Sequence, residues 1–409
     1  MGKDSAKNLV GQPIFKQMID LLPKDTFEML VHKHGSDRYY KRFFSWTQLV
    51  TMLFGVFSRC DSMGEICAGM GALEGKLNYF GMDSSPAKST VGDGLRDREH
   101  ILFRDYYFAL IKHFSSIFSV SRQEKISFEK FYAFDSTTIS LFSDVLKGVG
   151  RNPKGDGKKK GGLKVHMQTD VHSESAQYVY ISEAKEHDRK FLDRLSLTKG
   201  SMIVFDRAYN DYNWFAEQSE KGIWFVCRMK DNAVYRVQQV VSSRVLEKDS
   251  FGILKEEHVH LKYKEEKEEK TLCLRRIIYK DEQRRIFVFI TNNFDIIAEE
   301  VAFLYKKRWT IELLFEKLKG NFQLTYFYSE TENGIKTQVW CTLIACLLLM
   351  VLVAKTKTKK AFSTVPTLIR IYLISHQASF WVIENSRRTY TQRTKRRNKS
   401  PAIQMSLSF

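Results

Sequence analysis

Apolar residues follow one spacing in the first part of the chain and another in its middle. From about Gln12 to Phe118 they recur three and four positions apart, which is the period of helices that bury one face. From about Phe128 onward, short apolar runs of strand length alternate with polar turns. A helical pattern returns beyond Gly334. The spacing therefore predicts an all-helical N-terminal region, a mixed α/β middle and C-terminal helices.

The helical region contains a sequence that could contact DNA. A strong helix opens at Ser45, a shorter one contains Ile66 and Met70, and a third starts at Ser85-Pro86 and runs through Arg98. Two short helices followed by a Ser/Thr-rich helix start resemble a helix-turn-helix, whose last helix can enter the major groove. A three-helix bundle without DNA contact has the same pattern, so both interpretations of Lys88–Arg98 remain open.

Two apolar runs in the middle region each end at an aspartate. Phe131–Phe134 is followed by Asp135, and Met202–Phe205 is followed by Asp206. A strand that delivers a carboxylate at its end suits a metal site, because the sheet fixes the position of the ligand. An aspartate that only caps the next turn is the alternative for each one. The repetition of the pattern favours a shared site.

A third acidic residue lies on a segment that we expect to be one helix, from Tyr305 to a stop at Gly320. At about 100° per residue, Tyr305, Arg308, Glu312 and Lys319 fall within an arc of roughly 60°. A carboxylate can hold a divalent metal while Arg and Lys bind phosphates. A solvated outer face is the alternative. Glu316, about 20° off this arc, is a rival to Glu312 on geometry alone.

The net charge of +18 predicts a polyanionic partner, with nucleic acid favoured over a membrane. The segment Arg151–Lys164 is rich in Gly and Lys, and the tail Ser386–Ser400 is basic without an acid. Either could follow a phosphate backbone or be simply solvated. Candidate phosphate-binding cations are Lys158, Lys159, Lys160 and Lys164, together with Arg228 and Lys230 at the end of the strand predicted at Gly222–Lys230.

The cysteines and the longest apolar run indicate a reduced interior. The six cysteines form no Cys-x-x-Cys pair, which argues against a zinc site or a disulfide framework. The run Val339–Ala354 is shorter than the roughly 20 residues that span a bilayer, so we expect a buried core helix. A cytoplasmic, nucleoid-associated protein is the corresponding expectation.

The order Tyr305-(2)-Arg308-(3)-Glu312-(6)-Lys319 resembles the signature of insertion-sequence-four-type (IS4-like) DDE transposases. Asp206-Arg207-Ala208-Tyr209 resembles the second acidic motif of that family, Asp-Arg-Gly-Tyr, with Ala208 in place of the glycine. The three acids are separated by 206 − 135 = 71 and 312 − 206 = 106 residues. The longer gap would accommodate a β-rich insertion before the helix that carries Glu312.

The resemblance implies an α/β fold with a ribonuclease H-like catalytic core. Asp135, Asp206 and Glu312 would be catalytic and would hold two Mg²⁺ ions, for which Mn²⁺ could substitute. Tyr305, Arg308 and Lys319 would bind phosphates beside the scissile bond. The expected domains are residues 1–120 (helical, DNA-binding), 121–231 (first part of the core), 232–297 (β-rich insertion), 298–335 (core helix with Glu312) and 336–409 (C-terminal helices and basic tail).

The implied activity is cut-and-paste transposition, with cleavage at element ends, a hairpin intermediate and joining of 3′-ends to a target. The implied partners are double-stranded DNA, as terminal inverted repeats and target, and a second copy of the chain when ends are paired. Two other interpretations stay open, a nuclease of the same fold that never joins ends and a catalytically silent DNA-binding descendant. Trp224 and Trp309 could stack on a displaced base, although core packing is the expected role of each.

Overall fold

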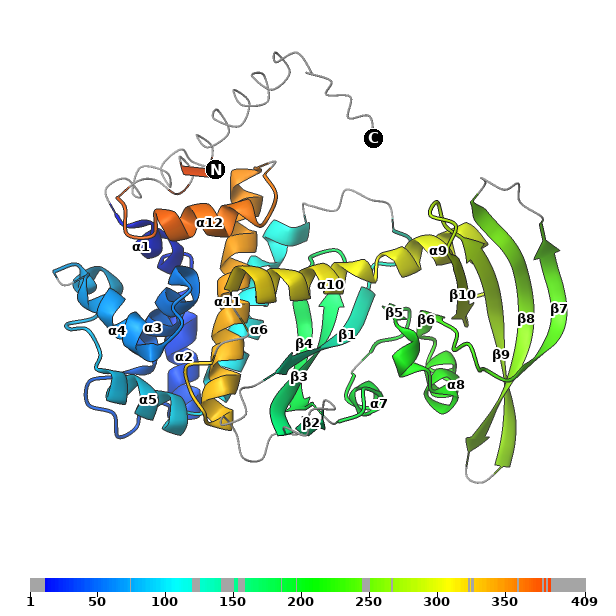
Figure 1. The fold of residues 1–409 in the computed structure, drawn as a ribbon, viewed down its shortest axis with the longest axis horizontal. Coiled ribbons are helices and arrows are strands. Elements are labelled where there is room, and N and C mark those ends of the chain that lie inside the picture. The colour runs from blue at the N-terminus through cyan, green and yellow to red at the C-terminus, as the bar shows by residue number, and fades with distance from the viewer. Residues whose placement is uncertain are drawn as a thin grey trace, which may run out of the picture. The chain divides into compact units, whose positions relative to one another are not determined.

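The computed structural model describes residues 12–73, 75–119, 126–140, 151–153, 159–184, 186–195, 197–244, 251–265, 268–322, 324, 327–358, 360–376, 379 and 382–383. The chain divides into two compact units. The helical unit comprises Met1–Ile117 and Gly320–Phe409, and the sheet unit comprises Phe118–Lys319. Figure 1 labels the elements of both units.

The helical unit contains the predicted N-terminal and C-terminal helices. Its elements are α1 (Ile14–Ile19), α2 (Lys24–His34), α3 (Ser45–Ser58), α4 (Met63–Gly71), η2 (Leu77–Phe80), α5 (Lys88–Asp97), α6 (Ile101–Ser119), α11 (Glu332–Thr356) and α12 (Thr364–Ile371). Local sequence explains several boundaries. Ser62 caps α4 by accepting a hydrogen bond from the Glu65 N–H, and α2 ends at Gly35, whose φ of 59° favours glycine.

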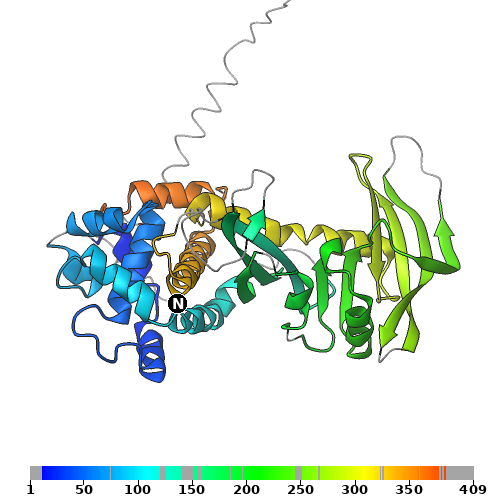
Figure 2. The same ribbon diagram turned by 60° about the horizontal axis from the view of Figure 1, so that its bottom comes forward.

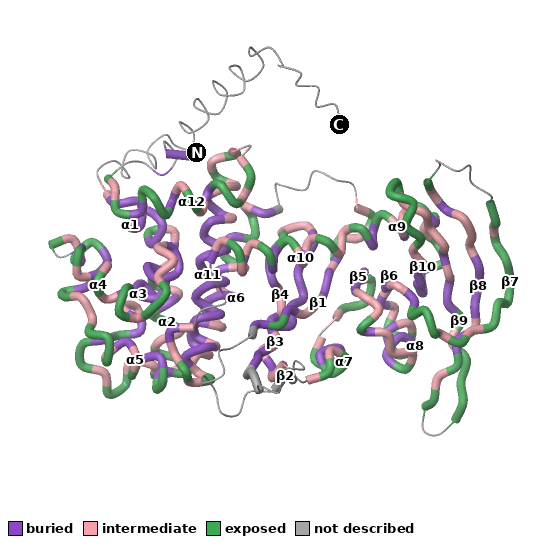
Figure 3. Tube along the Cα trace, viewed as in Figure 1, coloured by how far each residue is buried: buried purple, intermediate pink, exposed green. Residues whose placement is uncertain are grey.

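Helix α11 is the centre of the helical unit. It packs against α3 and α5, and most of its residues are buried (Figure 3). By length and composition alone α11 could cross a membrane, but 83% of its most apolar window is buried inside the protein. The prediction of a buried core helix at Val339–Ala354 is confirmed. We expected this helix to pack on the catalytic core, whereas its contacts with α3 and α5 assign it to the helical unit.

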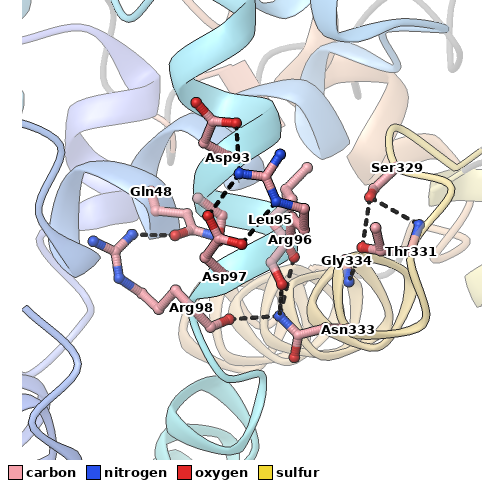
Figure 4. Close-up of polar contacts among 11 residues, drawn as sticks. Gln48, Asp93, Leu95, Arg96, Asp97, Arg98, Ser329, Thr331, Asn333 and Gly334 are labelled. Carbon is pink, nitrogen blue, oxygen red and sulfur yellow. Dashed lines mark hydrogen bonds and ion pairs between the residues drawn. The ribbon is translucent and has the colours of Figure 1, made fainter.

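A side chain near the start of α11 holds the end of α5 (Figure 4). The Asn333 amide nitrogen donates to the carbonyls of Leu95 at 3.0 Å and Arg98 at 2.7 Å, and its oxygen accepts from the His100 N–H at 2.9 Å. The last carbonyls of a helix have no intrahelical partner. Asn333 therefore supplies the C-terminal cap of α5 from a position more than two hundred residues later in the chain.

The sheet unit is built on one large mixed sheet, seen from a second side in Figure 2. Its strands are β1 (Phe131–Ser140), β2 (Arg151–Pro153), β3 (Lys159–Asp170), β4 (Ala176–Glu183), β5 (Met202–Phe205), β6 (Trp224–Arg228), β7 (Tyr235–Ser243), β8 (Gly252–Glu265), β9 (Glu268–Lys280) and β10 (Ile286–Thr291). The strand order is β2-β3-β1-β5-β6-β10-β9-β8-β7, with β4 paired to β3.

Strand direction divides the sheet. β1 and β3 are antiparallel, as are β3 and β4, whereas β1, β5 and β6 run parallel to one another. The helices of this unit are α7 (Arg189–Leu192), η3 (Arg207–Tyr209), α8 (Tyr212–Glu220), α9 (Ala298–Lys306), α10 (Trp309–Glu316) and the π-helical turn η4 (Lys317–Asn321). β5 is buried along its whole length, as a parallel strand covered on both faces should be.

Aromatic residues fill the core behind the parallel strands. Phe134 on β1 stacks on Phe205 on β5 with ring centroids 4.6 Å apart, and Phe215 on α8 stacks on Phe225 on β6 at 4.3 Å. All four rings are fully buried. These contacts hold the ends of β1 and β5 in a defined position, which matters because the candidate acids follow these rings.

Two local predictions were wrong. β1 continues to Ser140, so Asp135 is inside a strand, because β3 pairs with β1 from Tyr132 to Ser140. The segment Tyr305–Lys319 is not one helix, since Lys307 and Arg308 donate to the carbonyls three residues back and form a tight turn between α9 and α10. Gly320 does not stop it, because η4 continues to Asn321.

Candidate active site

Asp135 and Asp206 stand at equivalent positions of two neighbouring parallel strands. β1 and β5 pair with Ala133 opposite Val204, and each aspartate follows its paired residue by two positions (135 − 133 = 2 and 206 − 204 = 2). Parallel strands keep their register over so short a distance, so the two carboxylates meet at one edge of the sheet. Each accepts a hydrogen bond at 2.7 Å from the N–H of the next residue.

Arg308 brings the third acid to this edge. Its Nη1 lies 3.3 Å from Asp135 Oδ2, and its Nη2 forms an ion pair with Glu312. Arg308 has a side chain only 13% exposed, so the guanidinium is held among the carboxylates with little competition from water. Asp135 and Glu312, 177 residues apart in sequence (312 − 135 = 177), thus share one cation.

Tyr305 and Lys319 contact the same part of the sheet. The Tyr305 hydroxyl donates to Asp206 Oδ1 at 3.4 Å, and its ring packs against Phe289 at 4.7 Å. Lys319 Nζ donates to the Thr138 carbonyl at 3.3 Å. The two residues reach the site from α9 and η4, on either side of the helix that carries Glu312. Despite the break at Arg308, Tyr305, Arg308 and Glu312 converge at the aspartates, whereas Lys319 contacts β1 three residues beyond Asp135.

The pKa of the Asp135 carboxyl is raised to about 6. Burial is the main cause, and the negative charges of Asp206 and Glu312 add to it, while the Ser136 N–H and Arg308 act in the opposite direction. The negative charges of Asp206 and Glu312 thus act on the Asp135 carboxyl. Burial also raises the pKa of the Tyr305 hydroxyl and lowers that of the Lys319 ammonium.

The structure distinguishes Glu312 from its rival. The Glu312 side chain is 27% exposed and paired with Arg308, whereas Glu316, one turn later, is exposed. Within the described part of the chain, no hydrogen bond or ion pair joins Glu316 to the two aspartates or to Arg308. Glu312 is therefore the better candidate for the third acid.

The other predicted cations lie in different surroundings. The Arg228 guanidinium lies 5.2 Å from the Phe287 ring, and Lys230 Nζ donates to the Asn210 carbonyl at 3.4 Å. Lys164 is 3.2 Å from Asp188 and only 13% exposed, so its charge is already compensated. Lys159 and Lys160 belong to β3, while Lys158 and the basic tail Ser386–Ser400 lie outside the described residues.

A polar cluster beside the acids was not predicted. Ser136, next to Asp135 in β1, donates to Asp188 at 2.8 Å. Tyr209 is buried, and the pKa of its hydroxyl is raised by burial and then by the charges of Asp135, Asp188 and Asp206. The only sequence signal for Tyr209 was its place three residues after Asp206. Asp188 could not be found from the sequence, because its partner Ser136 lies 52 residues earlier, on another strand.

The two tryptophans differ in exposure. Trp309, next to Arg308, is 54% exposed, so the expectation that it packs in the core is wrong. It follows the tight turn that ends α9, and this turn directs the residue outward. Trp224 at the start of β6 is half-buried. Trp309 thus presents an exposed aromatic ring at the residue that follows Arg308 in sequence.

The donor chemistry of the three acids suits a divalent metal ion. Carboxylate oxygens are the ligands that Mg²⁺ and Mn²⁺ prefer. Within the described ranges, no group of three or more His, Cys, Asp or Glu side chains lies close enough together to hold an ion. The oxygens of Asp135 and Glu312 face the Arg308 guanidinium instead. These oxygens would hold a metal, and Arg308 would then be released to bind an anion.

Comparison with known families gives two matches. Residues 126–348 match the family described as "Transposase DDE domain", and this segment includes all three acids and every contact of the site. It covers 223 of the 409 residues (348 − 126 + 1 = 223), more than half of the chain. Residues 10–83 match a domain of unknown function, DUF4372.

Individual relatives carry related names. A Sinorhizobium fredii protein provisionally named as transposase y4zB is 28% identical over 198 residues, which is 48% of this chain and 55% of that protein. A Geobacillus stearothermophilus protein, provisionally named as the transposase for insertion sequence element IS5377, is 27% identical over 54% of this chain and 56% of its own length. The matches therefore span little more than half of these two relatives.

A match with a Bacillus thuringiensis protein extends further along the chain. The transposase for insertion sequence element IS231B is 22% identical in an alignment of 364 positions. The alignment covers 75% of this chain and 72% of that protein. Its similarity therefore reaches beyond the segment that contains the three acids.

Proposed function

Because the chain belongs to the transposase DDE domain family, we propose that it is the transposase of an insertion sequence, which cleaves phosphodiester bonds at the element ends and joins them to target DNA. The relatives named for insertion sequences support this activity. The observation that carries the proposal is the meeting of Asp135, Asp206 and Glu312 around Arg308. A cluster of solvated surface charges would not be expected to have two aspartates at matching positions of paired strands around one mostly buried arginine side chain.

We propose a ribonuclease H-like fold for the sheet unit. The support is the order β4-β3-β1-β5-β6, in which the first three strands are antiparallel neighbours and the last three are parallel. The remaining strands, β7 to β10, extend the same sheet beyond β6 and precede the helices that carry Arg308 and Glu312. This arrangement agrees with a β-rich insertion into the core.

Each residue of the site has a proposed role. Two Mg²⁺ ions held by the three carboxylates would supply charge stabilisation at phosphorus and activation of the attacking oxygen. Arg308, whose fork matches a phosphate, moves from the carboxylates to a non-bridging phosphate oxygen. Tyr305 and Lys319 hold neighbouring phosphates, so that the scissile bond is aligned for in-line attack. Trp309 covers the exposed side of the bound strand.

The proposed partners are the terminal inverted repeats and the target, both double-stranded DNA, and a second copy of the chain when two ends are paired. The net charge of +18 supports a polyanionic partner. Such a protein acts where the DNA is, so we place it in the cytoplasm with the nucleoid.

Strand transfer with precleaved ends tests the proposal. The DNA that flanks the gene supplies the ends, and the products with Mg²⁺ are resolved by gel electrophoresis. We expect nicking of intact ends and joining of precleaved ends, both lost in Asp135→Ala. Nicking without joining would indicate a nuclease of the same fold. Binding without either reaction, in Mg²⁺ and in Mn²⁺, would indicate a silent DNA-binding descendant.

A further inference from the structure

The connection between α2 and α3 is basic, aromatic and exposed. Residues 38–44 read Arg-Tyr-Tyr-Lys-Arg-Phe-Phe, with three cations and no acid. Arg38, Lys41 and Arg42 are exposed, and within the described part of the chain none of the three forms an ion pair with a carboxylate. Tyr39 is 87% exposed, and the Arg38 guanidinium lies over its ring at 5.0 Å. We call residues 38–42 the basic loop.

A buried arginine holds the loop from beneath. The Arg98 side chain is 0% exposed, and it donates to the carbonyls of Ser36 at 3.2 Å and Phe43 at 2.6 Å, on either side of the loop. Its guanidinium also lies 4.0 Å from the Tyr40 ring centroid. Bonds to both flanks of a loop restrict its backbone, so less conformational entropy is lost when it binds a ligand.

The same arginine connects the loop to helix α3. Asp37 accepts from Arg98 at 3.3 Å and from the Ser45 N–H at 2.7 Å, at the start of the helix. Arg98 also donates to Gln48 in the second turn of α3 (Figure 4). The loop is thus a rigid projection of the helical unit.

Tyr39 adopts a backbone conformation that is costly for its residue type. Its φ of 73° lies in the left-handed region, which is unfavourable for a bulky residue. Its ring is directed to solvent and contacts only Arg38 among the described aromatic and cation contacts. Strain that presents an exposed aromatic side chain is typical of a binding position.

The arginines of α5 do not offer a comparable surface. Arg98 is buried, which argues against the DNA contact that was one of the two interpretations left open for Lys88–Arg98. Arg96 donates to Asp97 at 2.8 Å and pairs with Asp93 at 2.9 Å (Figure 4), so two carboxylates already surround it. Acids on this helix would repel phosphates, and the candidate DNA contact moves from α5 to the basic loop.

A groove lies next to the loop. It has a volume of about 580 Å³, and its lining includes the cations Lys24 and Arg38, the rings of Phe44 and Trp46, and two acids that already have partners, Glu28 paired with Lys24 at 3.6 Å and Asp37 bound by Arg98. Phe44 is 44% exposed, and Lys24 Nζ lies 5.7 Å from the Trp46 ring centroid. A groove with cations and aromatic side chains at its rim suits a nucleic-acid backbone, where phosphates meet cations and sugars meet rings.

We propose that the basic loop and this groove bind the backbone of double-stranded DNA. Arg38, Lys41 and Arg42 contact phosphates, and Tyr39 packs against the sugars between them. The assignment rests on the proposed function and extends it by giving a role to the segment that matches a domain of unknown function, residues 10–83. Duplex DNA is favoured over an acidic protein, since the net charge of +18 and the proposed function both indicate a DNA partner.

Fluorescence anisotropy with a labelled mixed-sequence DNA duplex tests the surface in the full-length protein. The loop variant is Arg38→Ala, Lys41→Ala and Arg42→Ala together. Its control removes the same charge from exposed positions on three other helices of the unit, with Lys112→Ala, Lys355→Ala and Arg370→Ala. A separate variant, Tyr39→Gly, removes the ring but keeps the left-handed backbone.

The loop variant should bind roughly tenfold or more weakly than the control at physiological salt. The slope of the logarithm of the binding constant against the logarithm of the salt concentration should become shallower by about 0.9 for each lost phosphate contact. Tyr39→Gly should weaken binding several-fold without changing the salt dependence. Unchanged circular dichroism and thermal unfolding will show that the exposed substitutions leave the fold intact.

Two outcomes would overturn the proposal. Equal affinity of the loop and control variants would remove the surface and leave the proposed function standing, since the wild type would still bind DNA. Displacement of the DNA by polyglutamate at equal charge concentration would indicate a general acidic partner. No binding of wild type to the duplex at low salt would contradict the proposed function itself.

Discussion

Arg308 donates to Asp135, with Arg308 Nη1 3.3 Å from Asp135 Oδ2, and the same guanidinium pairs with Glu312. One positive charge thus lies between two of three carboxylates and reduces their mutual repulsion. If Arg308 leaves the carboxylates and binds a phosphate when DNA and metal bind, its positive charge is paired with an anion in both the free and the bound site. This dual role makes Arg308 the most informative single residue to change.

Arg308→Ala should slow cleavage much more than it weakens DNA binding, because a phosphate held only near the reacting bond contributes mainly to the transition state. We expect a loss of about 10²-fold or more in the single-turnover rate. Arg308→Lys should also be slow, since an ammonium cannot form a two-pronged contact. The matched control is Lys306→Ala, an exposed cation on α9. Near-normal rates in both Arg308 variants would contradict the role.

Replacing Asp135, Asp206 or Glu312 by Ala should abolish nicking and leave DNA affinity largely intact. Affinity comes from many phosphate contacts, whereas each carboxylate holds part of the metal site. The measurement pairs a cleavage assay with anisotropy on the same preparations. Glu316→Ala, four residues after Glu312 and exposed, is the control and should cleave normally. A Glu312→Ala protein that still cleaves would reassign the third acid.

Alanine substitutions of two arginines of the helical unit, two positions apart, should differ strongly in their effect on stability. Arg98→Ala removes the partner of Asp37 and leaves the Phe43 carbonyl without a donor, so we expect a loss of about 3 kcal/mol or more in unfolding free energy. Arg96→Ala removes only exposed ion pairs and should change stability little. Urea unfolding curves of both variants provide the measurement. Equal effects would mean that burial of Arg98 has no energetic consequence.

The helical unit should become less stable on mild acidification because of His100. Burial lowers the pKa of this histidine from 6.5 to about 4, and the charges of Lys336 and Arg104 act in the same direction. Between these values the unfolded chain binds a proton here and the folded chain does not. Lowering the pH through this range therefore favours unfolding. The two pKa values correspond to about 2 kcal/mol at pH 5, and solvent screening of this partly exposed side chain reduces the expected effect to about 1 kcal/mol.

His100→Gln should remove this component, since glutamine does not titrate, whereas His113→Gln, at an exposed position of α6, should retain it. Urea unfolding at pH 7 and pH 5 would measure the difference for each protein. If wild type and His100→Gln lose the same stability between the two pH values, another group is responsible.

Features that depend on neighbouring residues could be predicted from the sequence. The apolar runs before Asp135 and Asp206 predicted the strands that lead to them, and the spacing of Tyr305, Arg308 and Glu312 predicted side chains on a common face. The buried helix at Val339–Ala354 also followed from local composition. Such features can be predicted because burial of an apolar face is decided by a few consecutive positions.

Contacts between distant segments are set by packing in the folded protein. The register of β1 with β5 puts Asp135 beside Asp206, and the turn at Arg308 delivers its guanidinium to Asp135 from 173 residues away. In the helical unit, Arg98 is buried because the carbonyl of Phe43, 55 residues earlier, accepts its hydrogen bond. Whether an arginine is exposed or enclosed depends on which distant acceptors reach it. No pattern of spacing along the chain contains that information, because register and burial are set by packing between elements.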